Sequence, residues 1–112
     1  MAKRASRVRM TPSSGNVFAD LGLPNAEEEQ TKVRLAVSIN RIIERLGLSQ
    51  VAAARRLDVS QPKVSALSNY RLDGFSVERL IHFLNALDRD VEIVVRRKPR
   101  SRKAARILVT AA

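Results

Sequence analysis

Two helix-start signals lie about three helical turns apart in the middle of the chain. Ser49 is placed to cap one helix and Ser60 to cap the next, with Pro62 inside the first turn of the second helix. Only Asp58 and Val59 separate the two helices. Two short helices joined by so tight a turn predict a helix-turn-helix motif at residues 49–69, whose second helix is shaped to enter the DNA major groove.

Size and composition limit the rest of the fold. The 112 residues suit one small domain, and 45% hydrophobic but only 4% aromatic residues predict a core of Leu, Ile, Val and Ala. The absence of cysteine excludes disulfides and thiolate metal sites. No apolar run approaches the roughly 20 residues of a membrane span, and no signal-peptide stretch follows the basic start. We therefore expect no membrane association and a cytoplasmic, nucleoid-associated protein of a bacterial cell.

Charge is distributed unevenly along the chain. The formal charge is +10, yet residues 16–95 hold ten bases and all eleven acids. Residues 1–15 carry four bases and residues 96–112 carry seven, with no acid in either segment. We expect a folded domain over 16–98 between two disordered basic arms, the second over 99–112. Such arms favour polyanions, so they are either accessory nucleic-acid contacts or merely solvated ends.

Three further helical segments are predicted around the motif. Residues 16–24 have the pattern of a short helical turn, and a long helix is expected from Asn25 to Gly47. Ser76 is placed to cap another helix that ends near Leu87. The long helix carries a broad apolar stripe of Val33, Ala36, Val37, Asn40, Ile43 and Leu46, flanked by Leu35, Ile39 and Ile42. The fold class is therefore mainly α, a bundle of four to five helices.

The hydrophobic period changes after the last helix. Residues 91–97 alternate apolar and polar side chains, which predicts one C-terminal β-strand. A lone strand leaves its backbone groups unpaired, so we expect antiparallel pairing with a second copy across a two-fold dimer, or else with a strand of another protein. The expected dimerisation residues are Val91, Ile93, Val94 and Val95.

The outward-facing side chains of the motif are polar or basic, with no acid among them. Gln can pair with adenine, Lys can donate to guanine, and the backbone N–H groups at both helix starts suit phosphate oxygens. A simple helical hairpin with a polar surface is the alternative interpretation. The candidate DNA-binding residues are Ser49, Gln50, Ser60, Gln61, Pro62, Lys63, Ser65, Ser68, Asn69 and Arg71.

Catalysis finds little support in the sequence. The single histidine, His82, falls on a predicted helix beside apolar residues. Asp88, Asp90 and Glu92 are close in sequence, but without a glycine-rich loop or metal-ligand spacing they are typical of a solvated turn. We predict no enzyme activity, no metal and no cofactor.

The motif also resembles a known family. Ser49-Gln50, Ala53-Ala54, Leu57, the run Val59-Ser60-Gln61-Pro62, Val64-Ser65 and Leu67 look like the Cro/repressor (XRE-type) helix-turn-helix, over roughly residues 33–87. The resemblance implies a lambda-repressor-like bundle. It also implies that Gln50 and Gln61 cooperate in recognising an adenine and that Asn69 holds a phosphate. Asp58 stands where the family usually has Gly, and Asp tolerates left-handed backbone better than most residues.

A narrower resemblance covers about residues 15–98. The 16–23 segment, the acidic helix start and the closing strand are similar to HigA-type antitoxins. This implies a homodimer that binds its own promoter and neutralises a RelE-like (HigB-type) toxin, a ribosome-dependent mRNA endonuclease. Toxin binding would fall within residues 1–29, although the same apolar side chains could pack inside the domain. The candidate toxin-binding residues are Val17, Phe18, Leu21 and Leu23.

The predicted function is a repressor and antitoxin that binds a pseudo-palindromic operator on double-stranded DNA. The half-site centres should lie about 34 Å apart, one turn of DNA. A stand-alone, phage-like XRE regulator without a toxin is one alternative. A protein-interaction module that has lost DNA binding is the other.

Overall fold

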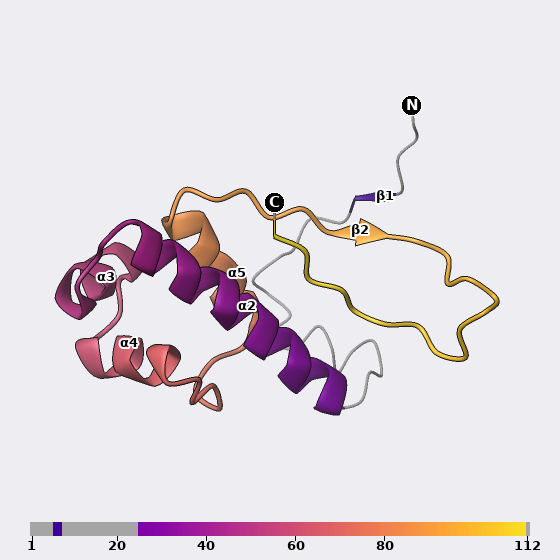
Figure 1. The fold of residues 1–112 in the computed structure, drawn as a ribbon, viewed down its shortest axis with the longest axis horizontal. Helices are drawn as coiled ribbons and strands as arrows, with labels where there is room; N and C mark the ends of the chain where they lie inside the picture. The colour runs from indigo at the N-terminus through magenta and orange to yellow at the C-terminus, as the bar shows by residue number, and fades with distance from the viewer. Residues whose placement is uncertain (1–5, 8–24, 112) are drawn as a thin grey trace.

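The computed structural model describes residues 6–7 and 25–111. Four helices lie in these residues, with α3 and α4 at one end of the molecule and an extended C-terminal chain at the other (Figure 1). The predicted helical turn at 16–24 lies outside the described residues. The elements are β1 (Ser6–Arg7), α2 (Asn25–Arg45), α3 (Gln50–Leu57), α4 (Gln61–Ser68), α5 (Val77–Ala86) and β2 (Val94–Val95).

Helix α2 begins and ends where the sequence predicts. Glu27 and Glu28 occupy its first turn, where carboxylates favour the positive end of the helix dipole. Gly47, with φ 68°, turns the chain out of the helix and donates its N–H to the Glu44 carbonyl at 3.0 Å. The predicted apolar stripe is displaced, since Val33 and Leu46 are 44% and 45% exposed. The residues that α2 buries against its neighbours are Leu35, Ala36, Ile39 and Ile42.

The turn between α3 and α4 has the predicted geometry. The Ser49 hydroxyl accepts the Ala52 N–H at 3.1 Å and so caps α3. Asp58 takes the left-handed conformation with φ 59°, and the N–H of Val59 then donates to the Ala54 carbonyl at 3.0 Å. Ser60 has the extended backbone of an N-cap, but its hydroxyl makes no capping bond. The helix-turn-helix is therefore confirmed as a fold.

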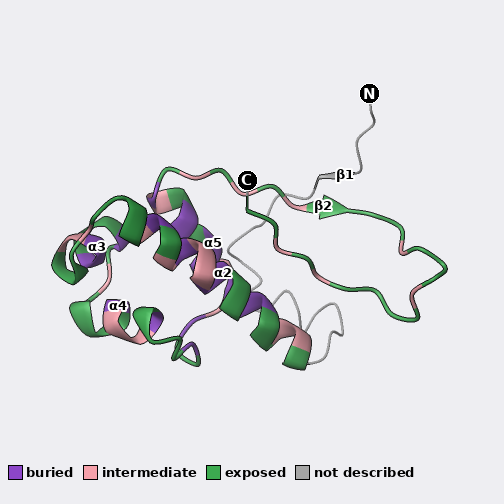
Figure 2. Ribbon diagram, in the orientation of Figure 1, coloured by how far each residue is buried: buried purple, intermediate pink, exposed green. Residues whose placement is uncertain are grey.

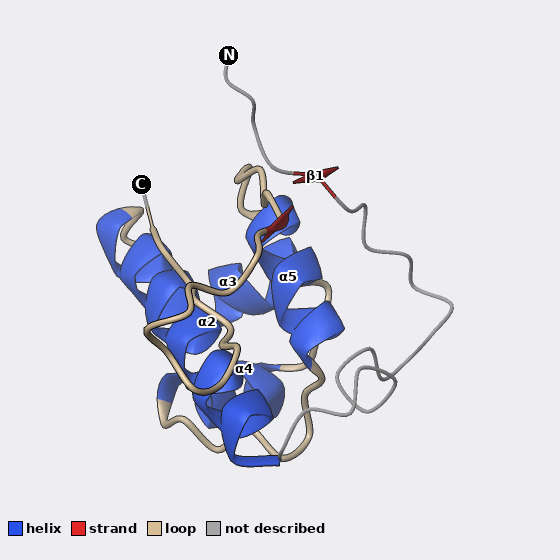
Figure 3. Ribbon diagram, turned by 90° about the vertical axis from the view of Figure 1, so that its right-hand side faces the viewer, coloured by secondary structure: helices blue, strands red, loops and turns tan. Residues whose placement is uncertain are grey.

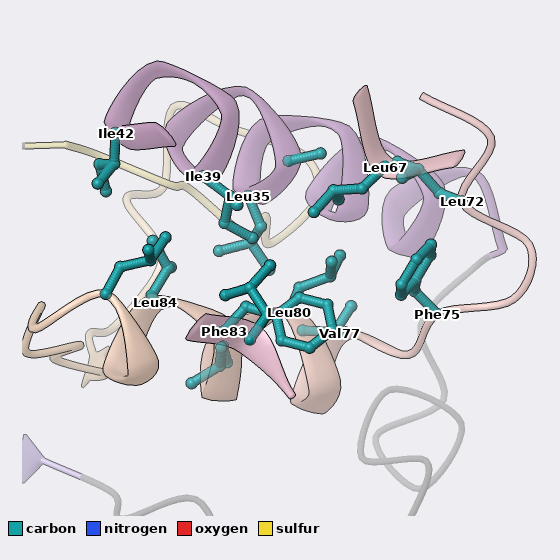
Figure 4. Packing of buried hydrophobic residues seen from close by; sticks show 14 residues of the cluster. Leu35, Ile39, Ile42, Leu67, Leu72, Phe75, Val77, Leu80, Phe83 and Leu84 are labelled. Atoms are coloured by element: carbon teal, nitrogen blue, oxygen red, sulfur yellow. The ribbon is translucent and has the colours of Figure 1, made fainter. Parts of the chain in front are cut away.

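The main core lies between α2 and α5 and is completed by α4 (Figure 4). Figure 2 shows the buried faces of these helices turned toward one another. Ser76 caps α5 by accepting the Arg79 N–H at 3.0 Å, as predicted. The loop before α5 adds Leu72 and Phe75, which the sequence analysis did not assign to the core. Phe75 meets Phe83 edge-on, with ring centroids 5.8 Å apart.

A smaller cluster joins α3 to α4. It consists of Ala53, Ala54 and Val64, all buried. Small alanines let the two helices approach closely, so this cluster fixes how α4 is presented on the surface.

Strand β2 is shorter than the predicted strand at 91–97 and finds its partner within the chain. It pairs antiparallel with β1, with Ser6 opposite Val95 and Arg7 opposite Val94. The premise that a lone strand must pair with a second copy was therefore wrong, because β1 was not foreseen in the basic arm. A two-stranded sheet still leaves the second edge of β2 without a ladder partner in the described residues.

The C-terminal chain also differs from the disordered tail that composition suggests. It lacks helix and strand, yet it lies against α2 (Figure 3). The Ile107 N–H donates to the Glu27 carboxylate at 3.0 Å, and Arg34 donates to the Ile107 carbonyl at 3.1 Å. Ile107 and Val109 pack against the main core. These two apolar residues hold the segment against the domain although the residues around them are mostly basic. In the described part of the chain, no helix is long and apolar enough to cross a membrane.

Candidate nucleic-acid interface

The starts of α3 and α4 bring two predicted residues together. Gln50 and Gln61 are both exposed, and the Gln61 side-chain amide donates to the Gln50 side-chain oxygen at 3.5 Å. This distance is at the long end of hydrogen bonding, so the pair is adjacent without being tightly held. Their remaining amide groups are available to an external partner.

One face of helix α4 is buried against the domain and the opposite face is exposed to solvent. Val64 and Leu67 are buried, while Pro62 and Ser68 are exposed and Ser65 is half-buried. The same helix therefore offers a polar surface on a rigid apolar base. The short length of α4, eight residues, makes this support necessary, since an isolated helix of that size is unstable in water.

The end of α4 is held by two asparagines. Asn69, its C-cap, donates from its side chain to the Ser65 carbonyl at 2.9 Å. Asn40 of α2 donates to the Leu67 carbonyl at 3.1 Å. Asn40 was predicted only as a member of the apolar stripe of the long helix. A polar residue within that stripe was the available signal for its role in positioning α4.

Lys63, which the sequence predicts to contact guanine, has partners within the chain in this structure. Its ammonium group donates to the Gly74 carbonyl at 3.2 Å and lies 4.8 Å from the centroid of the Phe75 ring. A cation over an aromatic ring and beside a carbonyl is favourably placed. Lys63 therefore ties α4 to the loop that follows it, and its predicted contact with guanine stays a prediction.

Three exposed arginines, Arg55, Arg56 and Arg71, lie in or next to the motif. Arg56 reaches the end of α5, donating to the Ala86 carbonyl and the Asp88 carboxylate, each at 3.1 Å. Helices α3 and α4 contain no acidic residue, so the negative charge nearest to their surface comes from outside them, from Asp58 in the turn and from Glu44 of α2.

The remaining predicted positions lie apart from this surface. His82 is exposed on α5, and the described residues hold no group of three potential metal ligands. The candidate toxin-binding residues Val17, Phe18, Leu21 and Leu23 lie outside the described residues. Of the predicted dimerisation residues, Val91 and Ile93 are half-buried, whereas Val94 and Val95 are 39% and 54% exposed.

Comparison with known proteins places this arrangement in a family. A family model described as a helix-turn-helix domain matches residues 17–96. A solved structure described as a candidate XRE-family transcriptional regulator shares 68% identity, with a TM-score of 0.77, over 80% of this chain and all of that one. The chain belongs to the XRE family of helix-turn-helix proteins. A comparison with curated proteins finds no match. The match to the family model ends at residue 96, just after β2. The basic C-terminal segment of this XRE-family member therefore lies outside the matched region.

Proposed function

We propose that this chain is a sequence-specific DNA-binding repressor that inserts α4 into the major groove. The observation that carries the proposal is the exposed pair Gln50 and Gln61, side by side at the starts of α3 and α4. A glutamine side chain can donate to and accept from an adenine edge at once, and a second glutamine can orient the first. The family membership supports the same activity.

The other exposed groups suit the DNA backbone. Helix N-termini present free N–H groups to phosphate oxygens, and Ser49 and Ser60 stand at those two starts. Asn69 and Arg71 lie at the opposite end of α4, where they suit phosphates on the far side of the groove. Contacts on both sides would fix the register of α4 against the bases.

A two-fold dimer on a pseudo-palindromic operator is part of this proposal. Each α4 would occupy one major groove, with half-site centres about 34 Å apart. The second edge of β2 and the exposed Val94 and Val95 provide a surface on which two copies could pair antiparallel. Intramolecular pairing with β1 uses the first edge, and among the described residues no strand pairs with the second edge.

We further propose that the repressor is an antitoxin of a RelE/HigB-like toxin. The support is the resemblance of residues 15–98 to HigA-type antitoxins, together with apolar residues in the 17–23 segment ahead of the DNA-binding core. The alternative of a stand-alone regulator rests on the same family membership without a toxin.

Co-expression with the neighbouring gene separates these two roles. A small basic protein that elutes with this chain supports the antitoxin, and loss of that protein when Phe18 and Leu21 are changed to Ser assigns the segment. A chain that elutes alone and still binds its own promoter DNA is a plain repressor. A chain that binds a partner protein but no DNA would be an interaction module, and the repressor proposal would fail.

A further inference from the structure

Tyr70 closes α4 with an unusual backbone. It follows the C-cap Asn69 and takes φ 58°, in the left-handed region that glycine adopts without strain. Its N–H donates to the Leu67 carbonyl at 3.2 Å, and the next N–H, of Arg71, donates to the Ala66 carbonyl at 2.9 Å. This is the usual way for a helix to end, but glycine is the usual residue at that position.

The other strained positions have a local reason that Tyr70 lacks. Among the described residues, left-handed backbone at non-glycine positions occurs at Asp58, Tyr70 and Asp88. Aspartate tolerates this conformation because its short polar side chain can bond the local backbone. A tyrosine side chain gains nothing of that kind. Strain retained without local compensation points to a function for the side chain itself.

The side chain of Tyr70 lies beside the proposed DNA-reading surface. Tyr70 lines an open hollow together with Gln50, Ser68 and Glu44, so the hollow includes one member of the glutamine pair. The residue is 45% exposed. In the described part of the chain, its hydroxyl has no hydrogen-bond partner. A tyrosine side chain combines an apolar ring with a hydroxyl that can donate to a ligand.

We propose that Tyr70 is a further DNA-contacting residue whose hydroxyl donates to a phosphate oxygen at the C-terminal end of α4. Tyrosine hydroxyls are among the groups that contact DNA backbones and set the register of a reading helix. The proposal rests on the DNA-binding function proposed above.

The test compares Tyr70→Phe with the wild-type chain on two duplexes. One is the duplex that the wild-type chain selects from a randomised pool, and the other is a scrambled duplex of the same length. Phenylalanine keeps the ring and the backbone strain but removes the hydroxyl. We expect affinity for both duplexes to fall about two- to tenfold, the worth of one hydrogen bond. The slope of log affinity against log salt should not change, because a neutral donor displaces no counterion.

Two further variants separate contact from packing. Thr110→Val removes an exposed hydroxyl elsewhere and should leave affinity unchanged. Tyr70→Gly relieves the strain, so its melting temperature should not fall while its affinity falls at least as far as that of Tyr70→Phe. Wild-type affinity for Tyr70→Phe, with a lower melting temperature for Tyr70→Gly, would overturn the assignment and make the ring a packing element. Failure of the wild-type chain to prefer any duplex would instead overturn the proposed function.

Discussion

Gln61 at the start of α4 places its side-chain amide 3.5 Å from the side-chain oxygen of Gln50 at the start of α3, although 11 positions separate them in the chain. The tight turn at Asp58 and the small buried alanines bring the two residues together. Under the proposed function, we expect the pair, and not either glutamine alone, to contact the DNA bases.

Replacing Gln61 with Ala should remove base discrimination at one operator position. We expect a loss of about 1–3 kcal/mol between the preferred and the substituted base pair, because a bidentate contact to adenine is lost. Fluorescence anisotropy with a set of single-base operator variants measures this loss. Gln30→Ala, an exposed glutamine on α2, is the matched control and should bind like the wild-type chain.

The pairing of the two glutamines adds a second expectation. Gln50→Ala should weaken the same base preference, and the double variant should lose less than the sum of the single losses, since the residues act together. Strict additivity, or an unchanged preference in Gln61→Ala, would contradict the base-reading assignment.

Neutralising the exposed cations Arg100, Lys103 and Arg106 with Gln should weaken DNA binding uniformly. Each phosphate contact contributes about 0.9 to the salt slope, so the slope should fall by up to about 3. Deleting residues 98–112 removes five cations and should lower the slope by up to about 4.5, but it would also remove Ile107 and Val109 from the core. The substitutions are therefore the cleaner test, and an unchanged slope would make the basic segment irrelevant to DNA.

Leu80→Ala should destabilise the domain strongly. Leu80 is completely buried in the cluster between α2 and α5, and such truncations cost about 2–5 kcal/mol. Chemical denaturation monitored by circular dichroism gives the free energy of unfolding. Val33→Ala, at a position 44% exposed, should stay within about 0.5 kcal/mol of the wild-type value. Equal losses in the two variants would mean that the core is placed wrongly.

The backbone of Asp58 predicts an order of stability. Asp58→Ala should cost about 1 kcal/mol, because alanine resists the left-handed conformation with φ 59°. Asp58→Gly removes the same charge but adopts that conformation freely, so it should be at least as stable as the wild-type chain. Urea denaturation of the three proteins compares them. An Ala variant as stable as the Gly variant would show that the turn is not left-handed in solution.

Charge placed on β2 tests the dimer. Val94→Lys should yield monomers in sedimentation equilibrium, because a lysine on each copy would bring like charges together across the proposed strand pair. Ile93→Asp, at a half-buried position, should also disrupt the pair. Val33→Lys is the control at an exposed position of α2. Dimers that persist in Val94→Lys would move the interface away from β2.

Local signals in the sequence were enough to predict the four helices of the described residues and the capping bonds of two of them. Ser49 and Ser76 cap as expected because capping depends on residues three positions away. The same holds for the left-handed turn at Asp58 and for the exposure of Gln61. These features depend on neighbours in the chain and on helical periodicity, both of which a single sequence carries.

Features that depend on distant partners could not be predicted. Lys63 contacts Gly74 and Phe75 because the loop before α5 passes beside α4, and the path of that loop depends on the whole fold. Asn40 meets the Leu67 carbonyl across 27 positions, and Ile107 meets Glu27 across 80. Which face of α2 is buried likewise depends on how α5 packs against that helix. The hydrophobic period of α2 alone does not determine this face.

The measurement that tests the central claim most directly is selection of duplexes from a randomised pool by the wild-type chain and by the double variant Gln50→Ala, Gln61→Ala. The account predicts that the wild-type chain enriches a pseudo-palindrome with half-site centres about 34 Å apart, and that the double variant keeps weak binding but loses the enrichment. Equal enrichment by both proteins, or none by the wild-type chain, would contradict it.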